Sequence, residues 1–276
     1  MKNYSLKKLS TISLGGKCKE YVCPKDIDEL QNFLKTNKRC LFIGNGSNIC
    51  FITNYYNGMI LSLKRLNKHL HHDEKYIYTS CNVSCTKLAR YAHNNQIPGF
   101  EFLYGIPGTI GGAIFMNAGA FEKEILDCIK SLTLVDRYGK IREILKKDLR
   151  YGYRSSKLDK TDLVISAIFK KPKSKFDSFL LNKLNAVRKR NQPTNQLSCG
   201  CIFKNPKGYY ASKLIQDAKL QGKKFGGIYI SNKHANYFIN DGSGSYNDFL
   251  KLLNYVKKSI SDKYGIQLEE EVVLIK

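Results

Sequence analysis

Apolar residues recur every three or four positions in five stretches of the chain, which is the spacing of one face of a helix. The last of these begins at Ser245, where Asp248 is placed like the acidic member of a capping box. The expected inward positions of the five helices are Ile27, Leu30, Phe33 and Leu34 in 27–37; Cys85, Leu88, Ala89 and Ala92 after an N-cap at Ser84; Phe176, Leu180, Leu184 and Val187 in a basic helix over 176–190; Tyr210, Ala211, Leu214, Ile215 and Ala218; and Phe249, Leu252, Leu253, Val256 and Ile260.

Short apolar runs bounded by turn residues predict the strands. They cover 40–43, 76–80, a hairpin of 131–136 with 141–145, then 163–169 and 268–275. Strands that alternate with separate pairs of helices favour an α+β fold in two domains. The polar stretch 170–175 contains Pro172 and suits a domain junction, so we expect domains at 1–175 and 176–276.

Composition excludes several classes of protein. The 276 residues are 42% hydrophobic and 25% charged, which is not the composition of a disordered chain. The longest apolar runs fall short of the roughly 20 residues that a membrane helix needs. The first residues are basic and carry no apolar core of a signal peptide. We therefore expect a cytosolic protein without a membrane partner.

The charge balance is strongly basic, with 46 Lys and Arg against 23 Asp and Glu and a net charge of +23. Such a balance favours anionic partners such as nucleic acids, phosphorylated cofactors or nucleotide-linked substrates. The basic residues are spread along the chain without a long block or an RNA-binding signature. A lysine-rich solvated surface is therefore favoured over a nucleic-acid site.

The nine cysteines do not suggest a metal site or a disulfide framework. Their number is odd and no C-x-x-C pair occurs. Cys199 and Cys201, and likewise Cys81 and Cys85, lack partners at zinc-finger spacing. We expect reduced thiols that pack mostly as small buried hydrophobes, and no metal.

Two glycine-rich loops suggest phosphate binding. The first, 44–48, follows a strand, but position 49 is Ile, so the third glycine of a Rossmann fingerprint is absent. The second covers 105–112. Backbone N–H groups of glycine approach a phosphate without interference from a Cβ. Tight turns would explain either loop alone; two such loops favour a cradle for a pyrophosphate.

The two loops belong to a series of segments spread over nearly the whole chain. The series is Gly44-Asn45-Gly46-Ser47-Asn48, Gly105-Ile106-Pro107-Gly108-Thr109-Ile110-Gly111-Gly112, Asn117-Ala118-Gly119-Ala120, Tyr153-Arg154-Ser155-Ser156, Cys201-Ile202-Phe203-Lys204-Asn205-Pro206, the run 231–240 and Leu268-Glu269-Glu270-Glu271-Val272. In this order, the segments resemble the UDP-N-acetylenolpyruvoylglucosamine reductase family, in its shorter, type II-like subclass.

The resemblance implies an FAD-binding domain of the vanillyl-alcohol-oxidase (PCMH) type at 1–175, followed by a smaller α+β substrate-binding domain at 176–276. It implies FAD and NADPH as cofactors and UDP-N-acetylglucosamine enolpyruvate as substrate in bacterial cell-wall peptidoglycan synthesis. We expect a monomer without nucleic acid. The residues that it places at the cofactor are Gly44, Asn45, Gly46, Ser47, Asn48, Gly105, Pro107, Gly108, Thr109, Gly111, Gly112, Asn117 and Gly119.

The same resemblance assigns catalytic roles. In the family's reaction, the reduced flavin gives hydride from N5 to the terminal carbon of an enol ether, and a proton then reaches the neighbouring carbon. Arg154 matches the family's arginine, and a guanidinium stabilises charge that develops on the substrate carboxylate. Glu271 matches the family's glutamate near the C-terminus; in a strand it should share a face with Val273 and Ile275. Glu269 and Glu270 are expected to be solvated.

Cys201 departs from the family pattern, because most members have serine there as the proton donor. A thiol has a reference pKa of about 8.5, far below that of an alcohol, so a cysteine loses its proton more easily. An alternative alignment makes Ser198 the donor but breaks the spacing to Phe203. We therefore expect Cys201 to be the donor, and to be open to oxidation and alkylation if its surroundings favour the thiolate.

The substrate-binding residues that the resemblance implies are Tyr153, Lys204 and Asn205. Lys204 matches a region that contacts the substrate diphosphate, and Asn205 either binds substrate or stabilises its own loop. His234 and Asn236 are expected either as positioning residues or as part of the pocket wall. Two alternatives stay open: an oxidase of another substrate on the same flavin scaffold, for which the glycine loops would serve equally, and a basic nucleic-acid-binding protein without catalysis.

Overall fold

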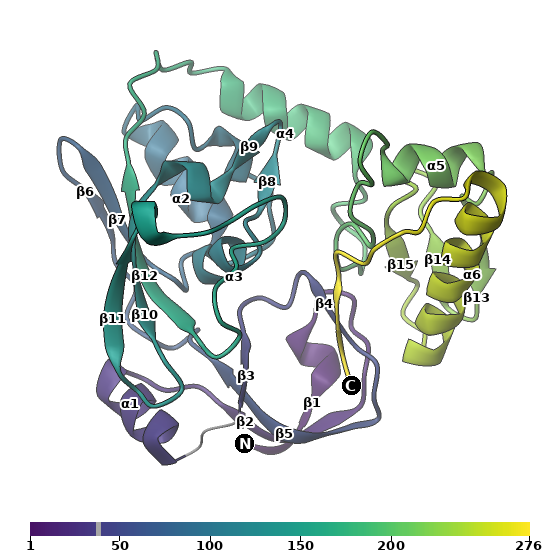
Figure 1. The fold of residues 1–276 in the computed structure, drawn as a ribbon, viewed down its shortest axis with the longest axis horizontal. Coiled ribbons are helices and arrows are strands. Elements are labelled where there is room, and N and C mark those ends of the chain that lie inside the picture. Colours follow the sequence, from purple (N-terminus) through teal and green to yellow (C-terminus); the bar gives the residue numbers. More distant parts are fainter. Residues whose placement is uncertain (37–39) are drawn as a thin grey trace. The chain divides into compact units, whose positions relative to one another are not determined.

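The structure is a computed structural model that describes residues 1–36 and 40–276. The chain forms two compact units, which we describe separately (Figure 1). Unit 1 contains residues 1–20, 45–57 and 188–276, and unit 2 contains residues 21–44 and 58–187. These units reflect contacts within the fold, whereas the expected domains are continuous segments, so the boundary after residue 175 stays a prediction.

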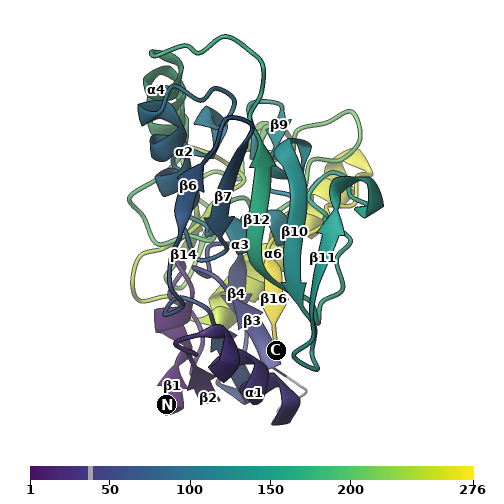
Figure 2. The same cartoon turned by 90° about the vertical axis from the view of Figure 1, so that its left-hand side faces the viewer.

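Unit 2 is built on a five-stranded antiparallel sheet. Figure 2 shows its strands side by side. Their order is β11 (Ile141–Leu145), β10 (Ile129–Val135), β12 (Leu163–Lys170), β7 (Tyr76–Ser80) and β6 (Leu70–His72). Alternate residues of these strands, such as Leu132, Leu134, Ala167 and Phe169, are buried. The predicted hairpin and the strands near 76 and 163 are thereby confirmed.

Two helices of unit 2 begin where the sequence predicts, at Ile27 and at Cys85. Ser84 caps α2 (Cys85–Asn94) by accepting a hydrogen bond from the N–H of Lys87 at 3.1 Å, and the four expected inward residues are buried. Thr109 caps α3 (Ile110–Phe115), which packs beside β12. α1 covers Ile27–Thr36; its predicted last residue, Asn37, lies outside the described residues.

The remaining elements of unit 2 are short. A two-stranded hairpin of β8 and β9 follows α3 and leads into a 3-10 helix. β3 runs parallel to the second half of β5. These elements are β3 (Cys40–Ile43), β5 (Tyr55–Ser62), η2 (Glu101–Leu103), β8 (Gly119–Ala120), β9 (Lys123–Glu124), η3 (Ile125–Cys128) and η4 (Lys146–Asp148).

Unit 1 contains a three-stranded antiparallel sheet with the long helix α6 against it. Phe238 of the sheet packs against Phe249 of α6 with ring centroids 5.5 Å apart. The elements are β1 (Lys2–Ser5), η1 (Leu6–Leu9), β2 (Lys17–Val22), β4 (Ile49–Phe51), α5 (Ala211–Asp217), β13 (Lys224–Phe225), β14 (Ile228–Ile230), β15 (Phe238–Asn240), α6 (Tyr246–Tyr264) and β16 (Val273–Ile275). β16 runs parallel to β4, and β1 pairs antiparallel with the first half of β2.

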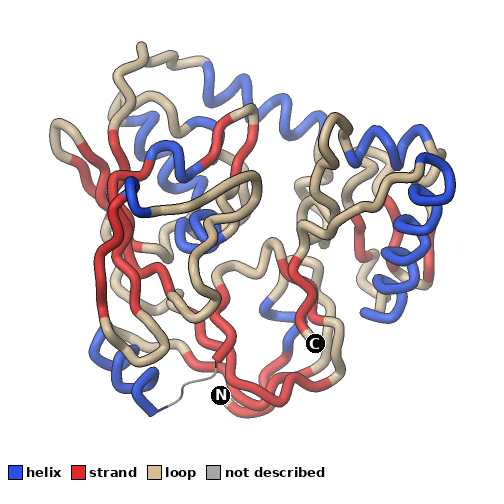
Figure 3. The backbone as a smooth tube through the Cα atoms, viewed as in Figure 1, coloured by secondary structure: helices blue, strands red, loops and turns tan. Residues whose placement is uncertain are grey.

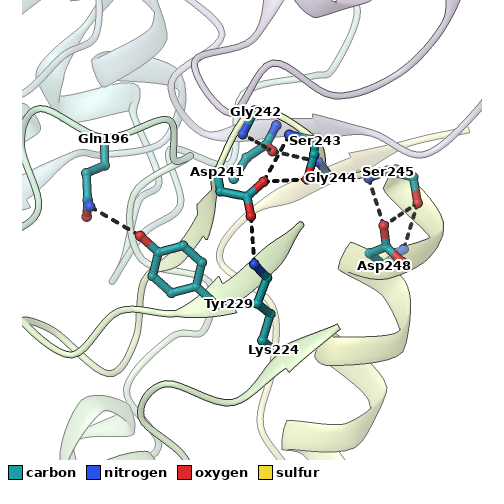
Figure 4. Close-up of polar contacts among 10 residues, drawn as sticks. Gln196, Lys224, Tyr229, Asp241, Gly242, Ser243, Gly244, Ser245 and Asp248 are labelled. Atoms are coloured by element: carbon teal, nitrogen blue, oxygen red, sulfur yellow. Dashed lines mark hydrogen bonds and ion pairs between the residues drawn. The ribbon is translucent and has the colours of Figure 1, made fainter. Parts of the chain in front are cut away.

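The start of α6 matches its prediction closely (Figure 4). The Ser245 hydroxyl accepts from the N–H of Asp248 at 3.1 Å, and the Asp248 carboxylate accepts from the N–H of Ser245 at 3.0 Å. These two bonds form the expected capping box. Gly265 ends the helix with φ +67°, a left-handed conformation that glycine adopts without strain. The five expected inward residues of this helix are all buried.

Three details of the predicted elements are wrong. α4 covers Leu180–Asn191, so Phe176 precedes it, and its buried positions are Leu181 and Arg188 while Val187 is 37% exposed. Helical spacing alone did not identify the buried face, because the apolar residues Leu180, Leu184 and Val187 lie on a neighbouring face of the helix. Tyr210 precedes α5 and is 71% exposed. The last strand is confined to 273–275.

No helix in the described parts of the chain combines the length and the apolarity needed to cross a membrane.

Candidate functional site

Cys201 lies in unit 1 on a segment held between two others. The segment belongs to no helix or strand and lies in the loop between α4 and α5 (Figure 3). On one side, the N–H of Ile202 donates to the carbonyl of Asn236 at 2.9 Å. On the other side, the N–H of Glu271 donates to the carbonyl of Ile202 at 2.8 Å. The residue after Cys201 is thereby bonded on both sides.

The side chain of Asn236 reinforces this arrangement. It is buried, its Oδ1 accepts from the N–H of Phe203 at 3.0 Å, and its Nδ2 donates to the carbonyl of Phe203 at 2.8 Å. A buried backbone group needs a partner, and here one amide satisfies two such groups. Asn236 is therefore a positioning residue for the Cys201 segment, one of the two roles left open for it by the sequence.

Two of the three expected catalytic side chains, Cys201 and Glu271, thus belong to neighbouring segments of one unit. Both residues are half-buried. The Tyr237 hydroxyl hydrogen-bonds to the Cys201 thiol, and Tyr237 also interacts electrostatically with Glu271 and with Arg188. Burial raises the pKa of Tyr237 well above its usual value. The cluster therefore combines a thiol, a carboxyl, a phenol and a guanidinium.

Residues 45–48 of the first glycine loop lie in the same unit. The Nδ2 of Asn48 donates to the carbonyl of Glu271 at 3.0 Å, and the carbonyl of Asn48 accepts from the N–H of Val273 at 2.9 Å. Gly46 adopts φ +67°, and a Cβ there would collide with the backbone of Leu9. This position requires glycine.

Arg154, the third expected catalytic residue, lies in unit 2. Its Nη1 is 3.3 Å from the Oε1 of Glu124, and its Nη2 donates to the carbonyl of Gly119 at 3.1 Å. Its guanidinium stacks on the ring of Tyr153 at 4.8 Å. Arg154 itself has φ +55°, a strained conformation for a residue with a Cβ, and such strain clusters at functional sites.

Asn117 holds the carboxylate that pairs with Arg154. It is fully buried, and its Nδ2 donates to the Oε2 of Glu124 at 2.5 Å and to the carbonyl of Gly152 at 2.9 Å. One amide therefore connects Glu124 with the turn that carries Arg154. Asn117 and Gly119 were expected at the cofactor; in this structure their contacts support the guanidinium, and cofactor binding by them stays a prediction.

The second glycine loop, also in unit 2, packs closely against its surroundings. A Cβ on Gly111 would lie 2.9 Å from the Cβ of Cys81, and one on Gly44 would lie 2.6 Å from the Oγ1 of Thr109. Both approaches are so short that a Cβ at either position would force its neighbour to shift. Gly44 and Thr109, both expected at the cofactor, therefore lie side by side although they are far apart in the sequence.

Polar groups beside both loops suit a bound flavin nucleotide. Asn82 is buried and its Nδ2 donates to the carbonyls of Leu63 and Leu66, but its Oδ1 has no hydrogen-bond partner among residues 1–36 and 40–276. Within the same described ranges, the buried Oγ of Ser10, beside Gly46, also has none. Leaving such a group unpaired is costly. A hydroxyl group of FAD would supply a donor to Asn82 in unit 2, and a phosphate would supply an acceptor to Ser10 in unit 1, so each unit taken by itself offers a group that fits the cofactor.

The expected substrate-binding residues have structural partners of their own. Lys204 forms an ion pair with Glu269, and the Oδ1 of Asn205 accepts from the N–H of Ala211 at 3.0 Å. Asn205 thus stabilises its own loop, one of the two predicted alternatives. The Glu269 side chain is 71% exposed, as expected. Glu270 is not solvated as predicted; it is partly buried and pairs with Lys257 at 2.7 Å.

All nine cysteines are free thiols. Burial raises the pKa of Cys50 to about 12 and that of Cys199 well above its usual value. These two thiols are fully buried, whereas Cys201 is partly accessible. Within the described ranges no group of three or more His, Cys, Asp or Glu side chains is arranged to hold a metal ion.

Sequence reasoning did not single out Glu124, Tyr237 or Arg188. Tyr237 lies in one of the motif segments but carries no signal of its own. Glu124 and Arg188 are separated from the side chains they act on by 30 and 49 residues respectively. These residues could have been identified only from knowledge of contacts between residues that are far apart in the sequence.

Comparison with known families gives two matches along the chain. Residues 19–145 match the model described as "FAD binding domain". Residues 192–275 match the model described as "UDP-N-acetylenolpyruvoylglucosamine reductase, C-terminal domain". The two matches follow one another in the order expected for a flavin domain and a substrate domain.

Individual relatives cover nearly the whole chain. A protein of Fusobacterium nucleatum named UDP-N-acetylenolpyruvoylglucosamine reductase is 35% identical over 99% of this chain and 98% of its own length. One of the same name from Oceanobacillus iheyensis is 37% identical over 95% of this chain and 87% of its own length. The crystal structure of UDP-N-acetylenolpyruvylglucosamine reductase from Thermus caldophilus superposes with a TM-score of 0.83, 26% identity and coverage of 99% and 98%.

Proposed function

The chain belongs to the UDP-N-acetylenolpyruvoylglucosamine reductase family, and we propose that within this activity it takes electrons from NADPH and the final proton from the thiol of Cys201. It is thus an FAD-dependent oxidoreductase of peptidoglycan synthesis. This membership decides between the alternatives left open by the sequence, in favour of the reductase over an oxidase of another substrate.

The observation that carries the proposal is the bonding of the Cys201 segment. Ile202 accepts from Glu271 and donates to Asn236, so the thiol and the carboxyl stand on neighbouring segments of a rigid arrangement. A general acid must be held at a defined position relative to the reacting atom. The amide of Asn236 supplies that rigidity.

When bound, FAD reduced by NADPH supplies the hydride. Arg154 holds the substrate carboxylate, where negative charge increases as hydride arrives. Glu271 lies beside Cys201 and helps to polarise the enol ether. Cys201 then gives its proton to the carbon that bears oxygen and carboxylate. Tyr153, Lys204 and Asn205 are proposed to bind the substrate, and Lys204 would exchange Glu269 for a phosphate.

An anaerobic stopped-flow experiment tests this function. The purified protein should absorb near 450 nm because of bound FAD, and NADPH should bleach that band. Adding UDP-N-acetylglucosamine enolpyruvate should then restore it much faster than buffer alone. Reoxidation that ignores this substrate would contradict the reductase function. Cytosolic location, a monomeric state and the absence of nucleic acid stay predictions.

A further inference from the structure

The proposed roles of Cys201 and Glu271 leave the neighbouring, half-buried Tyr237 unexplained. The hydroxyl of Tyr237 donates a hydrogen bond to the sulfur of Cys201, and the two residues face each other as partners of an antiparallel bridge. A phenol is rarely buried without a partner. Here its partner is the thiol from which the substrate proton is proposed to come.

The Tyr237 side chain is held firmly in this position. Its backbone N–H donates to the carbonyl of His234 at 3.0 Å, and its carbonyl accepts from the N–H of Ser231 at 2.9 Å. Its ring packs edge-on against the imidazole of His234, with centroids 4.9 Å apart. The hydroxyl therefore has little freedom to turn away from the sulfur.

The charged and titratable groups around this pair come from four segments. Arg188 from α4 is a buried cation that acts on Tyr237, Glu271 is the acid on the far side of the Cys201 segment, and Cys199 precedes Cys201. Burial lowers the pKa of His234, so its imidazole is neutral at neutral pH. Arg188 thus contributes positive charge close to the phenol.

Tyr237 is unsuited to be an acid itself. Desolvation and the neighbouring sulfur raise its pKa well above the usual value. A thiol of ordinary acidity loses its proton long before such a phenol. The phenol therefore keeps its proton when Cys201 becomes a thiolate, and it can continue to donate a hydrogen bond.

We propose that Tyr237 is a positioning residue that stabilises the thiolate left on Cys201 after proton transfer. This inference rests on the proposed function, in which Cys201 is the donor. In that step the S–H bond breaks, a C–H bond forms on the substrate, and sulfur keeps the electron pair. The Tyr237 hydroxyl keeps its proton and donates to the thiolate, an interaction stronger than that with the neutral thiol.

The Tyr237 hydroxyl should also change the reactivity of Cys201 when no substrate is bound. A donor that favours the thiolate lowers the pH at which Cys201 reacts with an alkylating reagent, because the thiolate is the nucleophile. We would measure alkylation of the FAD-bound enzyme by iodoacetamide as a function of pH and quantify the Cys201 peptide by mass spectrometry. Tyr237→Phe should raise the pH midpoint by about one unit.

A matched control is Tyr229→Phe, whose hydroxyl accepts a hydrogen bond from Gln196 at 3.2 Å at an exposed position in the same unit. The pH midpoint of Cys201 alkylation in Tyr229→Phe should equal that in the unmodified enzyme. A Tyr237→Phe midpoint that is unchanged or lower overturns the inference. If Tyr237→Phe does not fold, the Tyr237→3-fluorotyrosine protein decides: its stronger donor should lower the midpoint, and an unchanged midpoint overturns the inference.

A second readout separates this role from simple support of the fold. Tyr237→Phe should slow substrate-driven flavin reoxidation about tenfold while NADPH-driven reduction keeps its rate, since only reoxidation by substrate forms the thiolate. Equal slowing of both steps overturns the inference. Failure of the proposed function would look different: the substrate would not accelerate reoxidation even in the unmodified enzyme.

Discussion

The guanidinium of Arg154 and the carboxylate of Glu124 form an ion pair, with Nη1 3.3 Å from Oε1. The other oxygen of Glu124 is held at 2.5 Å by the buried amide of Asn117. Arg154 has a strained backbone, and its second nitrogen is bonded to the carbonyl of Gly119. These contacts hold the guanidinium in a defined orientation, which the proposed binding of a substrate carboxylate requires.

This pair predicts a role for Glu124 in catalysis. Glu124→Gln removes the charge that orients Arg154, so substrate-driven flavin reoxidation should slow about tenfold, equivalent to about 1.4 kcal/mol. NADPH-driven reduction should be unchanged in the same stopped-flow traces. Glu143→Gln, at an exposed glutamate of β11, is the control. If Glu124→Gln reoxidises at the unmodified rate, the orienting role is wrong.

Replacing the proposed acid should affect one half-reaction only. Cys201→Ala should leave flavin reduction by NADPH intact and slow reoxidation by substrate about 100-fold or more, because a general acid contributes a factor of this size. Cys201→Ser should keep partial activity, since serine is the family's usual donor. The control is Cys23→Ser, at a half-buried thiol of unit 2. Equal loss of both half-reactions in Cys201→Ala would refute the assignment.

The amide of Asn236 should contribute strongly to stability. Asn236→Ala leaves the buried N–H and carbonyl of Phe203 without their partner, which should lower the free energy of unfolding by about 2–4 kcal/mol. Urea denaturation followed by circular dichroism measures this. Asn232→Ala, at an exposed position nearby, should change it little. Similar values for both variants would show that the amide bonds are unimportant.

Two adjacent glycines of the second loop should differ in tolerance. Gly111→Ala places a methyl group 2.9 Å from Cys81, whereas one on Gly112 would meet only the Oγ1 of Thr109, at 3.5 Å. Gly111→Ala should therefore lower the melting temperature of the flavin-free protein, and Gly112→Ala should not, because alanine favours the helix. Calorimetry compares them, and the reverse order would contradict the packing described here.

The capping box of α6 predicts a dependence of stability on pH. The Ser245 hydroxyl lowers the pKa of Asp248, so the stability that this carboxylate contributes is present above its unfolded pKa of about 3.9 and is lost as the pH falls through its lower folded value. The difference in melting temperature between the unmodified protein and Asp248→Asn should therefore disappear below about pH 4.

Two further variants test whether the Asp248 carboxylate stabilises α6 through its cap. Ser245→Ala should cost about 1 kcal/mol at neutral pH, the usual effect of losing an N-cap. Asp262→Asn changes an exposed acid near the other end of α6 and should show no such disappearance. A difference for Asp248→Asn that persists unchanged into acid would mean that the carboxylate does not stabilise the cap through its charge.

Local sequence signals predicted the structure best where the interaction is itself local. The capping box at Ser245 and the N-cap at Ser84 each join residues three positions apart, so the sequence states them directly. The prediction for α4 failed because its buried residues, Leu181 and Arg188, are selected by packing rather than by hydrophobic spacing. The final strand was overextended because an apolar pattern does not show where pairing stops.

The motif segments determined by themselves which chemical groups the protein carries: a guanidinium at Arg154, a thiol at Cys201 and a carboxyl at Glu271. Only the tertiary structure decided what surrounds those groups. Glu124 reaches Arg154, and Tyr237 reaches Cys201, across 30 and 36 residues of chain. No short-range pattern encodes such pairs, because they form only when separate segments are brought together by packing and by backbone hydrogen bonds.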